Sequence, residues 1–167
     1  MNFEIVQHLA ASADAVSAAL VDPRFLARMG ELPKLGSAEV LEQRRDGDVV
    51  HQDVRYLFEA ELSRAVTRVV DPARLTWIER SVCDLVMQTT DCEIRPDHYA
   101  GLLSGHYRSI VRSIGAASDS GCHRTITGAV KVKMPLVGGK VEGAIVGGLR
   151  ENGAAQVGLL NGWIASG

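Results

Sequence analysis

The spacing of apolar residues changes period along the chain. Phe3, Ile5 and Leu9 alternate with polar residues, which predicts a half-buried strand. The pattern then becomes helical: Ser12 is suited to cap one short helix, and Pro23 suits the first turn of a second. The N-terminal part therefore predicts a strand followed by two short helices.

Strand patterns dominate between residues 37 and 134. Val50, Val54 and Tyr56 share one parity, and the Asp46-Gly47 step before them is a strong hairpin signal. Turn sequences such as "RPDH" and "SDSG" separate the later apolar runs. Further strands are predicted at about 75–84, 86–95, 99–114 and 123–134. Together these strands form an antiparallel meander.

Two segments have a helical period instead. Leu62, Val66 and Val69 recur at i, i+4 and i+7, which predicts a short amphipathic helix at one mouth of the sheet. After Pro135 the pattern is helical to the end, and a curved antiparallel sheet needs such a helix to cover its apolar face. The predicted inward stripe of this helix comprises Val141, Ala144, Ile145, Gly148, Leu149, Asn152, Ala155, Gln156, Leu159 and Trp163.

The glycine-rich segment "VKMPLVGGKVEGAIVGGLRENG" lies where this helix begins. It is not a phosphate-binding loop, because Met134 stands where that motif needs its first glycine and Val141 where it needs Ser or Thr. It is not a membrane-spanning helix either, because charged residues such as Glu142 interrupt it. We expect Gly138 and Gly139 to allow a sharp change of chain direction before the helix.

This order of elements resembles that of the START/birch-pollen-allergen (SRPBCC) superfamily. The stretch "ASADAVSAALVDPRFLARM" is similar to the first-helix region of that superfamily. The stretch "GAVKVKMPLVGGKVEGAI" resembles the strand-to-helix junction of an uncharacterised bacterial family within it. The resemblance implies an α+β helix-grip fold in one domain over residues 1–167. In that fold a curved antiparallel sheet of about six or seven strands wraps around a long C-terminal helix, and two short helices follow the first strand.

The resemblance also implies a cavity between the sheet and the C-terminal helix. Relatives use it for lipids, polyketides and other apolar molecules, so we expect this protein to bind a small hydrophobic ligand. The alternatives are a cofactor-independent enzyme of the cyclase or dehydratase type and a protein-interaction module with a vestigial cavity. Because a fold does not choose among functions, the candidate residues must decide.

Polar groups on apolar faces are the first candidates for ligand binding. Gln52 shares the parity of Val50 and Val54, and Gln88 that of neighbouring apolar residues, while Asn152 and Gln156 lie on the inward stripe of the long helix. These four amides could orient a ligand in an aliphatic pocket. The alternative is that they bond to backbone groups or to ordered water.

The aromatic residues Tyr56, Trp77, Tyr99 and Tyr107 are expected to border the same space, and Gly148 would leave room for the ligand. For strand 75–84 the parity leaves two inward faces open, one with Leu75 and Trp77 and one with Ile78 and Val82. His106 and Glu79 would transfer protons in an enzyme if their side chains face inward.

Composition restricts the partners. A net charge of -2 with mixed acids and bases gives no indication of nucleic-acid binding, and the N-terminus has no basic leader or long apolar core. Three cysteines, Cys83, Cys92 and Cys122, match neither a zinc site nor a disulfide framework. With five histidines that lack a metal-binding spacing, these features predict a cytoplasmic protein with no metal and no cofactor. Gly143 and Gly147, on the outer side of the long helix, leave a homodimer open.

Overall fold

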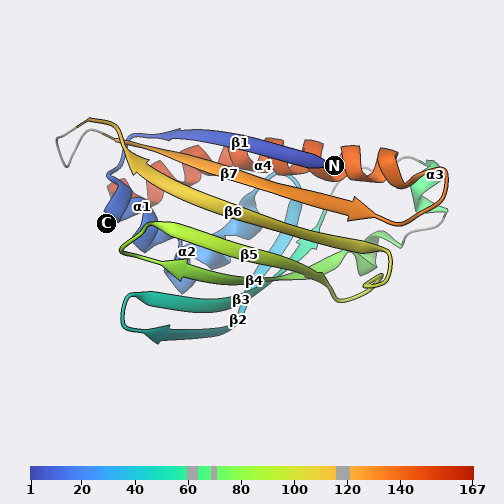
Figure 1. Ribbon diagram of the computed structural model, residues 1–167, viewed down its shortest axis with the longest axis horizontal. Helices are drawn as coiled ribbons and strands as arrows, with labels where there is room; N and C mark the ends of the chain where they lie inside the picture. The colour runs from blue at the N-terminus through green and yellow to red at the C-terminus, as the bar shows by residue number, and fades with distance from the viewer. Residues whose placement is uncertain (60–63, 69–70, 116–120) are drawn as a thin grey trace.

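A curved antiparallel sheet encloses a long C-terminal helix (Figure 1). The computed structural model describes residues 1–59, 64–68, 71–115 and 121–167. The described strands are β1 (Asn2–Leu9), β2 (Leu35–Asp46), β3 (Val49–Phe58), β4 (Thr76–Asp84), β5 (Thr89–Pro96), β6 (Leu103–Ser113) and β7 (Cys122–Val132). The described α-helices are α1 (Ala13–Ala19), α2 (Pro23–Arg28), α3 (Arg64–Thr67) and α4 (Gly138–Ser166), with 3₁₀ turns at Met29–Glu31 and Pro72–Arg74.

Within the described residues, the sheet has seven strands in the order β1-β7-β6-β5-β4-β3-β2. The neighbouring strands pair antiparallel, and consecutive strands are adjacent except that β1 joins β7. Figure 1 shows α4 running along β1 and β7, with α1 and α2 near its C-terminal end and α3 near its N-terminal end. This arrangement confirms the predicted fold class, including the two short helices after the first strand.

Local sequence signals account for the early elements. The Ser12 hydroxyl accepts a hydrogen bond from the Ala15 N–H (3.2 Å) and so caps α1. Asp22 caps α2, with Pro23 in the first turn. Gly47 has φ +59° in the β2–β3 hairpin, a conformation that favours glycine. The predictions at all three positions are confirmed.

The core consists of three apolar clusters beneath the sheet. Phe25 and Leu160 belong to one that joins α1 and α2 to the C-terminal half of α4. A second contains Phe3 and Val146 and fixes the N-terminal half of α4 to β1 and β7. The third includes Tyr56 and joins β3 to α2 and the following 3₁₀ turn. The three buried cysteines are free, and Cys122 belongs to the first cluster, so they act as small apolar groups.

The predicted strand 86–95 begins too early. β5 starts only at Thr89, because the preceding residues form a turn in which the Asp84 carboxylate accepts from the backbone N–H groups of Val86 (3.0 Å) and Met87 (2.8 Å). Gln88 closes this turn with φ +56°. The predicted alignment of Gln88 with the inward residues of β5 was therefore wrong, because strand parity does not extend through a turn.

The predicted amphipathic helix is described only in part. A short helix, α3, is present at residues 64–67, at the expected end of the sheet (Figure 1). The apolar positions on which the prediction depended, Leu62 and Val69 together with the side chain of Val66, lie outside the described residues.

The turn before α4 differs from the sequence expectation. Leu136, whose side chain is fully exposed, has φ +66° there, so the left-handed position is not occupied by a glycine. Gly138 is needed for a close approach, because a Cβ atom at this position would lie 2.6 Å from the Val132 carbonyl oxygen. Gly139 has nothing within 4 Å of the corresponding position. Only one of the two glycines therefore has a structural requirement at this junction.

Glu142 fastens the first turns of α4 to the sheet. Its Oε1 atom accepts a hydrogen bond from the Val132 N–H (2.8 Å), and Oε2 pairs with the Met1 amino group (3.0 Å). The bond from Val132 and the charge of the Met1 amino group hold the pKa of this carboxyl below its usual range. The end of β7 and the start of α4 are thus held together at this end of the cavity.

Candidate functional site

An elongated cavity of about 550 Å³ lies between the concave face of the sheet and α4. Its size is within the range of small-molecule sites, which are mostly apolar with a few placed polar groups. The apolar lining comes from β1, β5, β7 and α4 and includes Ile5, Ile94, Ile126, Val130, Ile145 and Leu149. Polar side chains interrupt this lining, among them Glu79 on β4 and Arg124 on β7, and Arg74, His98 and Lys140 also line the cavity.

The first polar place is a carboxylate held by two aromatic side chains. The Tyr107 hydroxyl donates to Glu79 Oε2 (2.8 Å), and Trp77 Nε1 donates to Glu79 Oε1 (3.3 Å). Burial raises the pKa of Glu79, although both hydrogen bonds act in the opposite direction. The surface that Glu79 still exposes borders the cavity. This carboxyl can therefore hold a proton at a higher pH than an ordinary glutamate.

The second polar place is a buried guanidinium. Arg124 on β7 is only 6% exposed and lines the cavity. Its Nε donates to Ser109 Oγ (2.8 Å), and Nη1 donates to the side-chain oxygens of Gln7 (3.2 Å) and Gln156 (2.9 Å). Desolvation lowers the pKa of Arg124, but an arginine side chain stays charged in proteins. A positive charge is thus built into an otherwise apolar wall.

Gln7 and Gln156 join β1 to α4 beside this arginine. Gln7 Nε2 donates to the Gly153 carbonyl (2.6 Å) and to Gln156 Oε1 (3.0 Å). Gln156 Nε2 reaches the Met29 sulfur (3.2 Å), which is a weak acceptor. Gly153 allows this approach, because a Cβ there would lie 2.9 Å from Ile5. The amide oxygens of both glutamines are therefore held toward Arg124.

The structure places most of the predicted ligand-binding residues on the cavity wall. Trp77 and Glu79 of β4 line the cavity, whereas Val82 borders the outer face of the sheet. Of the two alternatives that the sequence left open for this strand, the inward face is therefore the one with Leu75 and Trp77. Tyr99 also lines the cavity, and its hydroxyl accepts from the Asp71 N–H (3.1 Å). The predicted residues that line the cavity are Tyr56, Trp77, Tyr107, Gly148, Asn152 and Gln156.

Two predicted residues lie elsewhere. Gln52 is buried, but it donates to the Leu20 carbonyl (3.3 Å) and accepts from Gln43 (3.0 Å), so it fixes β3 to the end of α1. Gln88 donates to the Asp14 carboxylate (2.6 Å) in an exposed contact. The predicted role of these two amides in the cavity was therefore wrong. Gln52 follows the alternative of bonding to a backbone group, whereas Gln88 bonds to a side-chain carboxylate, which neither expectation named. Asn152, although on the wall, accepts from the Lys34 N–H (2.9 Å).

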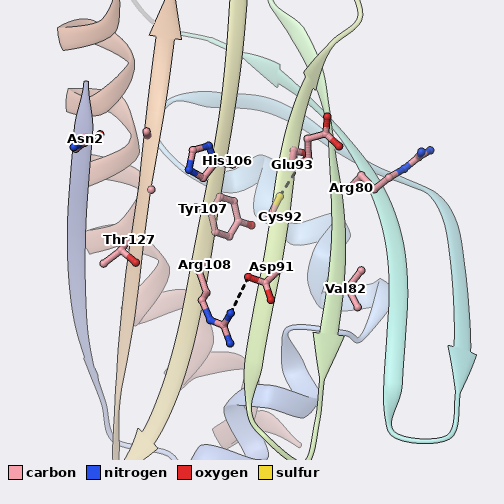
Figure 2. A pocket seen from close by; sticks show the side chains of 12 residues that line it. Asn2, Arg80, Val82, Asp91, Cys92, Glu93, His106, Tyr107, Arg108 and Thr127 are labelled. Atoms are coloured by element: carbon pink, nitrogen blue, oxygen red, sulfur yellow. Dashed lines mark hydrogen bonds and ion pairs between the residues drawn. The ribbon is translucent and has the colours of Figure 1, made fainter.

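His106 faces away from the cavity. It borders a depression of about 680 Å³ on the outer face of the sheet, where Figure 2 shows it among charged side chains. Arg108 pairs there with Asp91 (3.4 Å, dashed in Figure 2), and Arg80 pairs with Asp53 (2.6 Å). This depression is larger but wide open to solvent, and its charges already have partners. The enclosed cavity is therefore the candidate site.

Arg74, Arg124 and Lys140 line the cavity and were not predicted as site residues, and neither was Gln7, which holds Arg124 from β1. Arg124 has the parity of Ile126 and Val130, and Gln7 has that of Phe3 and Leu9, so both patterns carried a signal.

For the described part of the chain, no three His, Cys, Asp or Glu side chains are placed to hold a metal ion. No helix there is long and apolar enough to cross a membrane.

A curved antiparallel sheet closed by a long C-terminal helix, with a cavity between them, is the helix-grip fold of the START/birch-pollen-allergen-like superfamily. The chain belongs to the family described as "Protein of unknown function (DUF2505)", whose model matches residues 4–164. The resemblance inferred from the sequence is thereby confirmed. A search of curated proteins found no match.

Three solved structures show the same fold at low identity. A Thermus thermophilus protein, TTHA0849, is 14% identical with a TM-score of 0.70, and the match covers 99% of this chain and 98% of that one. The Zhui aromatase/cyclase of Streptomyces sp. R1128 is 14% identical with a TM-score of 0.66, covering 99% and 93%. A START superfamily protein of Mycobacterium smegmatis is 15% identical with a TM-score of 0.60, covering 99% and 97%. These likenesses show the fold alone.

Proposed function

We propose that this protein binds a small, mostly apolar molecule in the cavity between the sheet and α4. The observation that carries the proposal is the enclosed cavity of about 550 Å³, lined mainly by aliphatic side chains and interrupted by a few fixed polar groups. Aromatic side chains also line the cavity, namely Phe3, Tyr56, Phe58, Trp77, Tyr99 and Tyr107, and Tyr56 and Trp77 pack together with ring centroids 5.6 Å apart. Because aliphatic side chains outnumber these aromatic ones on the wall, a flexible apolar chain is the first ligand class to test.

Binding of a neutral apolar fluorophore, N-phenyl-1-naphthylamine, tests this function. We expect saturable binding at one site, competition by decan-1-ol, and an increase in Tm of about 5–10 °C when the ligand is at a hundred times its Kd. Native mass spectrometry of gently purified protein should show a retained small molecule. A His106→Ala variant, altered only in the outer depression, should bind equally well. Absence of both fluorophore binding and thermal shift would contradict the proposal.

A second candidate function is a cofactor-independent reaction in the same cavity, such as a dehydration. The observation that favours it is Glu79, a carboxyl with a raised pKa that faces the ligand space. Such a group holds a proton at a higher pH than an ordinary glutamate and can donate or accept it during a reaction. Tyr107 and Trp77 would keep the carboxyl oriented through their hydrogen bonds.

Comparison of bound molecules separates an enzyme from a binding protein. The wild-type protein and a Glu79→Gln variant would be produced in the same host, and their ligands extracted and weighed. An enzyme that dehydrates its substrate predicts that the variant retains a molecule heavier by one water. The same molecule in both proteins would contradict the enzymatic function and leave the binding function in place.

A further inference from the structure

Arg124 is a buried charge without a carboxylate partner in the described residues. None of the ion pairs within 4.0 Å there includes it, and its hydrogen bonds are to the neutral oxygens of Ser109, Gln7 and Gln156. These bonds use Nε and Nη1, whereas Nη2 has no partner among the described residues. Because Arg124 is only 6% exposed and lines the cavity, its remaining donor capacity is available to a ligand rather than to bulk water.

The energetics favour an anionic partner. A buried ion without a counter-ion carries a desolvation penalty, which neutral hydrogen-bond acceptors offset only in part. Glu79 is the acidic group among the described residues that line the cavity, but it makes no ion pair with Arg124 there and its burial favours the neutral form. The described part of the cavity wall around Arg124 therefore carries a positive charge that the protein does not neutralise directly.

We propose that the cavity takes an apolar molecule bearing one carboxylate, and that Arg124 binds this carboxylate. The inference rests on the proposed binding function and adds the chemical class of the ligand. The guanidinium can present paired N–H donors to the two oxygens of a carboxylate. Gln156 supplies a further donor, because its Nε2 is engaged only with the weak acceptor sulfur of Met29.

Gln7 and Gln156 act as positioning residues in this arrangement. Their side-chain oxygens both accept from Arg124 Nη1, and Ser109 accepts from Nε, so the guanidinium is held by β1, β6 and α4 together. The apolar tail of the ligand would extend from Arg124 along the aliphatic wall. A ligand with a neutral head group would fill the same space without compensating the charge.

Affinities for decanoate and decan-1-ol at neutral pH test the inference, with binding measured by displacement of N-phenyl-1-naphthylamine. The two probes share the same chain and differ in the head group. We expect the wild-type protein to bind decanoate about tenfold to a hundredfold more tightly, as a charge-assisted pair requires. Arg124→Gln should remove this preference, because it should lower the affinity for decanoate far more than the affinity for decan-1-ol. Arg108→Gln, on the outer face of the sheet, should keep it.

Each outcome decides between the inference and the function on which it rests. Equal affinities of the wild-type protein for the two probes would overturn the carboxylate assignment and leave apolar binding intact. Failure of both probes to displace the fluorophore would count against the binding function itself. If Arg124→Gln does not fold, Arg124→Lys keeps the charge but loses the paired donors, so an intermediate preference for decanoate supports the assignment. An undiminished preference in folded Arg124→Gln would overturn it.

Discussion

Replacement of Gly128 by alanine should lower the free energy of unfolding by about 3 kcal/mol, at the upper end of what overpacking costs. Gly128 lies on the inward face of β7, opposite Tyr107 on β6. A Cβ atom there would lie 2.3 Å from the His106 carbonyl oxygen, 2.7 Å from the Tyr107 Cβ and 2.8 Å from the Phe3 ring. Two of these contacts involve backbone or Cβ atoms, so the strands themselves must separate.

Thermal denaturation measures this effect. A loss of about 3 kcal/mol corresponds to a decrease in Tm of about 6–12 °C in a domain of this size. The Tyr107 hydroxyl donates to Glu79, so a displacement of Tyr107 should also weaken ligand binding by the folded fraction of this variant. Gly101→Ala is the matched control, since nothing lies within 4 Å of its added Cβ. An equal Tm for Gly128→Ala and the wild-type protein would show that β6 and β7 adjust without cost.

The fold could be predicted because each of its signals is local. The Asp46-Gly47 step needs only its own backbone conformation to form a hairpin, and Ser12 needs only a neighbouring N–H group to cap a helix. The inward stripe of α4 is likewise periodic over many residues. Its members that line the cavity are Val141, Ala144, Ile145, Gly148, Leu149, Asn152 and Gln156. Such features depend little on which distant strand becomes a neighbour.

The alternation of a strand predicts which side chains face inward. It predicts cavity residues only where no other element covers that inward face. Gln52 faces inward as expected, but the end of α1 covers that part of the sheet. The prediction for Gln88 was wrong for a different reason, because this residue belongs to a turn. Arg124 alternates in phase with apolar neighbours and is buried. Arginine is seldom fully buried, however, so its residue type gave no reason to expect it on the inward face. Only the packing of α4 on β1 and β7 shows which inward residues line the cavity.

Two of the polar groups of the cavity wall differ in their chemistry. Arg124, with Gln7 and Gln156, holds a fixed positive charge at one place, whereas Glu79 with its two aromatic donors can exchange a proton at another. Binding and catalysis would use these two groups differently. A carboxylate ligand would need the charge of Arg124. A proton-transfer reaction on that ligand would need Glu79 in addition.

Leucine in place of Gly148 should reduce the affinity for N-phenyl-1-naphthylamine and for decanoate by about tenfold. Gly148 is buried on the cavity side of α4, where an added Cβ would lie 3.2 Å from the Phe58 ring and 3.6 Å from the Lys34 side chain. The remaining carbon atoms of leucine would then occupy ligand space. Leucine also favours the helix by about 1 kcal/mol over glycine, so the loss of binding should occur without loss of folding.

Gly147→Leu provides the matched control, because it makes the same substitution one position earlier in the same helix. Nothing lies within 4 Å of a Cβ atom at Gly147, so this leucine should gain the same helix propensity and leave the cavity unchanged. Titration of both variants with the two probes isolates the effect of cavity volume. Equal reductions in both variants would indicate a change in the helix as a whole. Unchanged affinity in Gly148→Leu would show that the absence of a side chain at this position does not determine the capacity of the cavity.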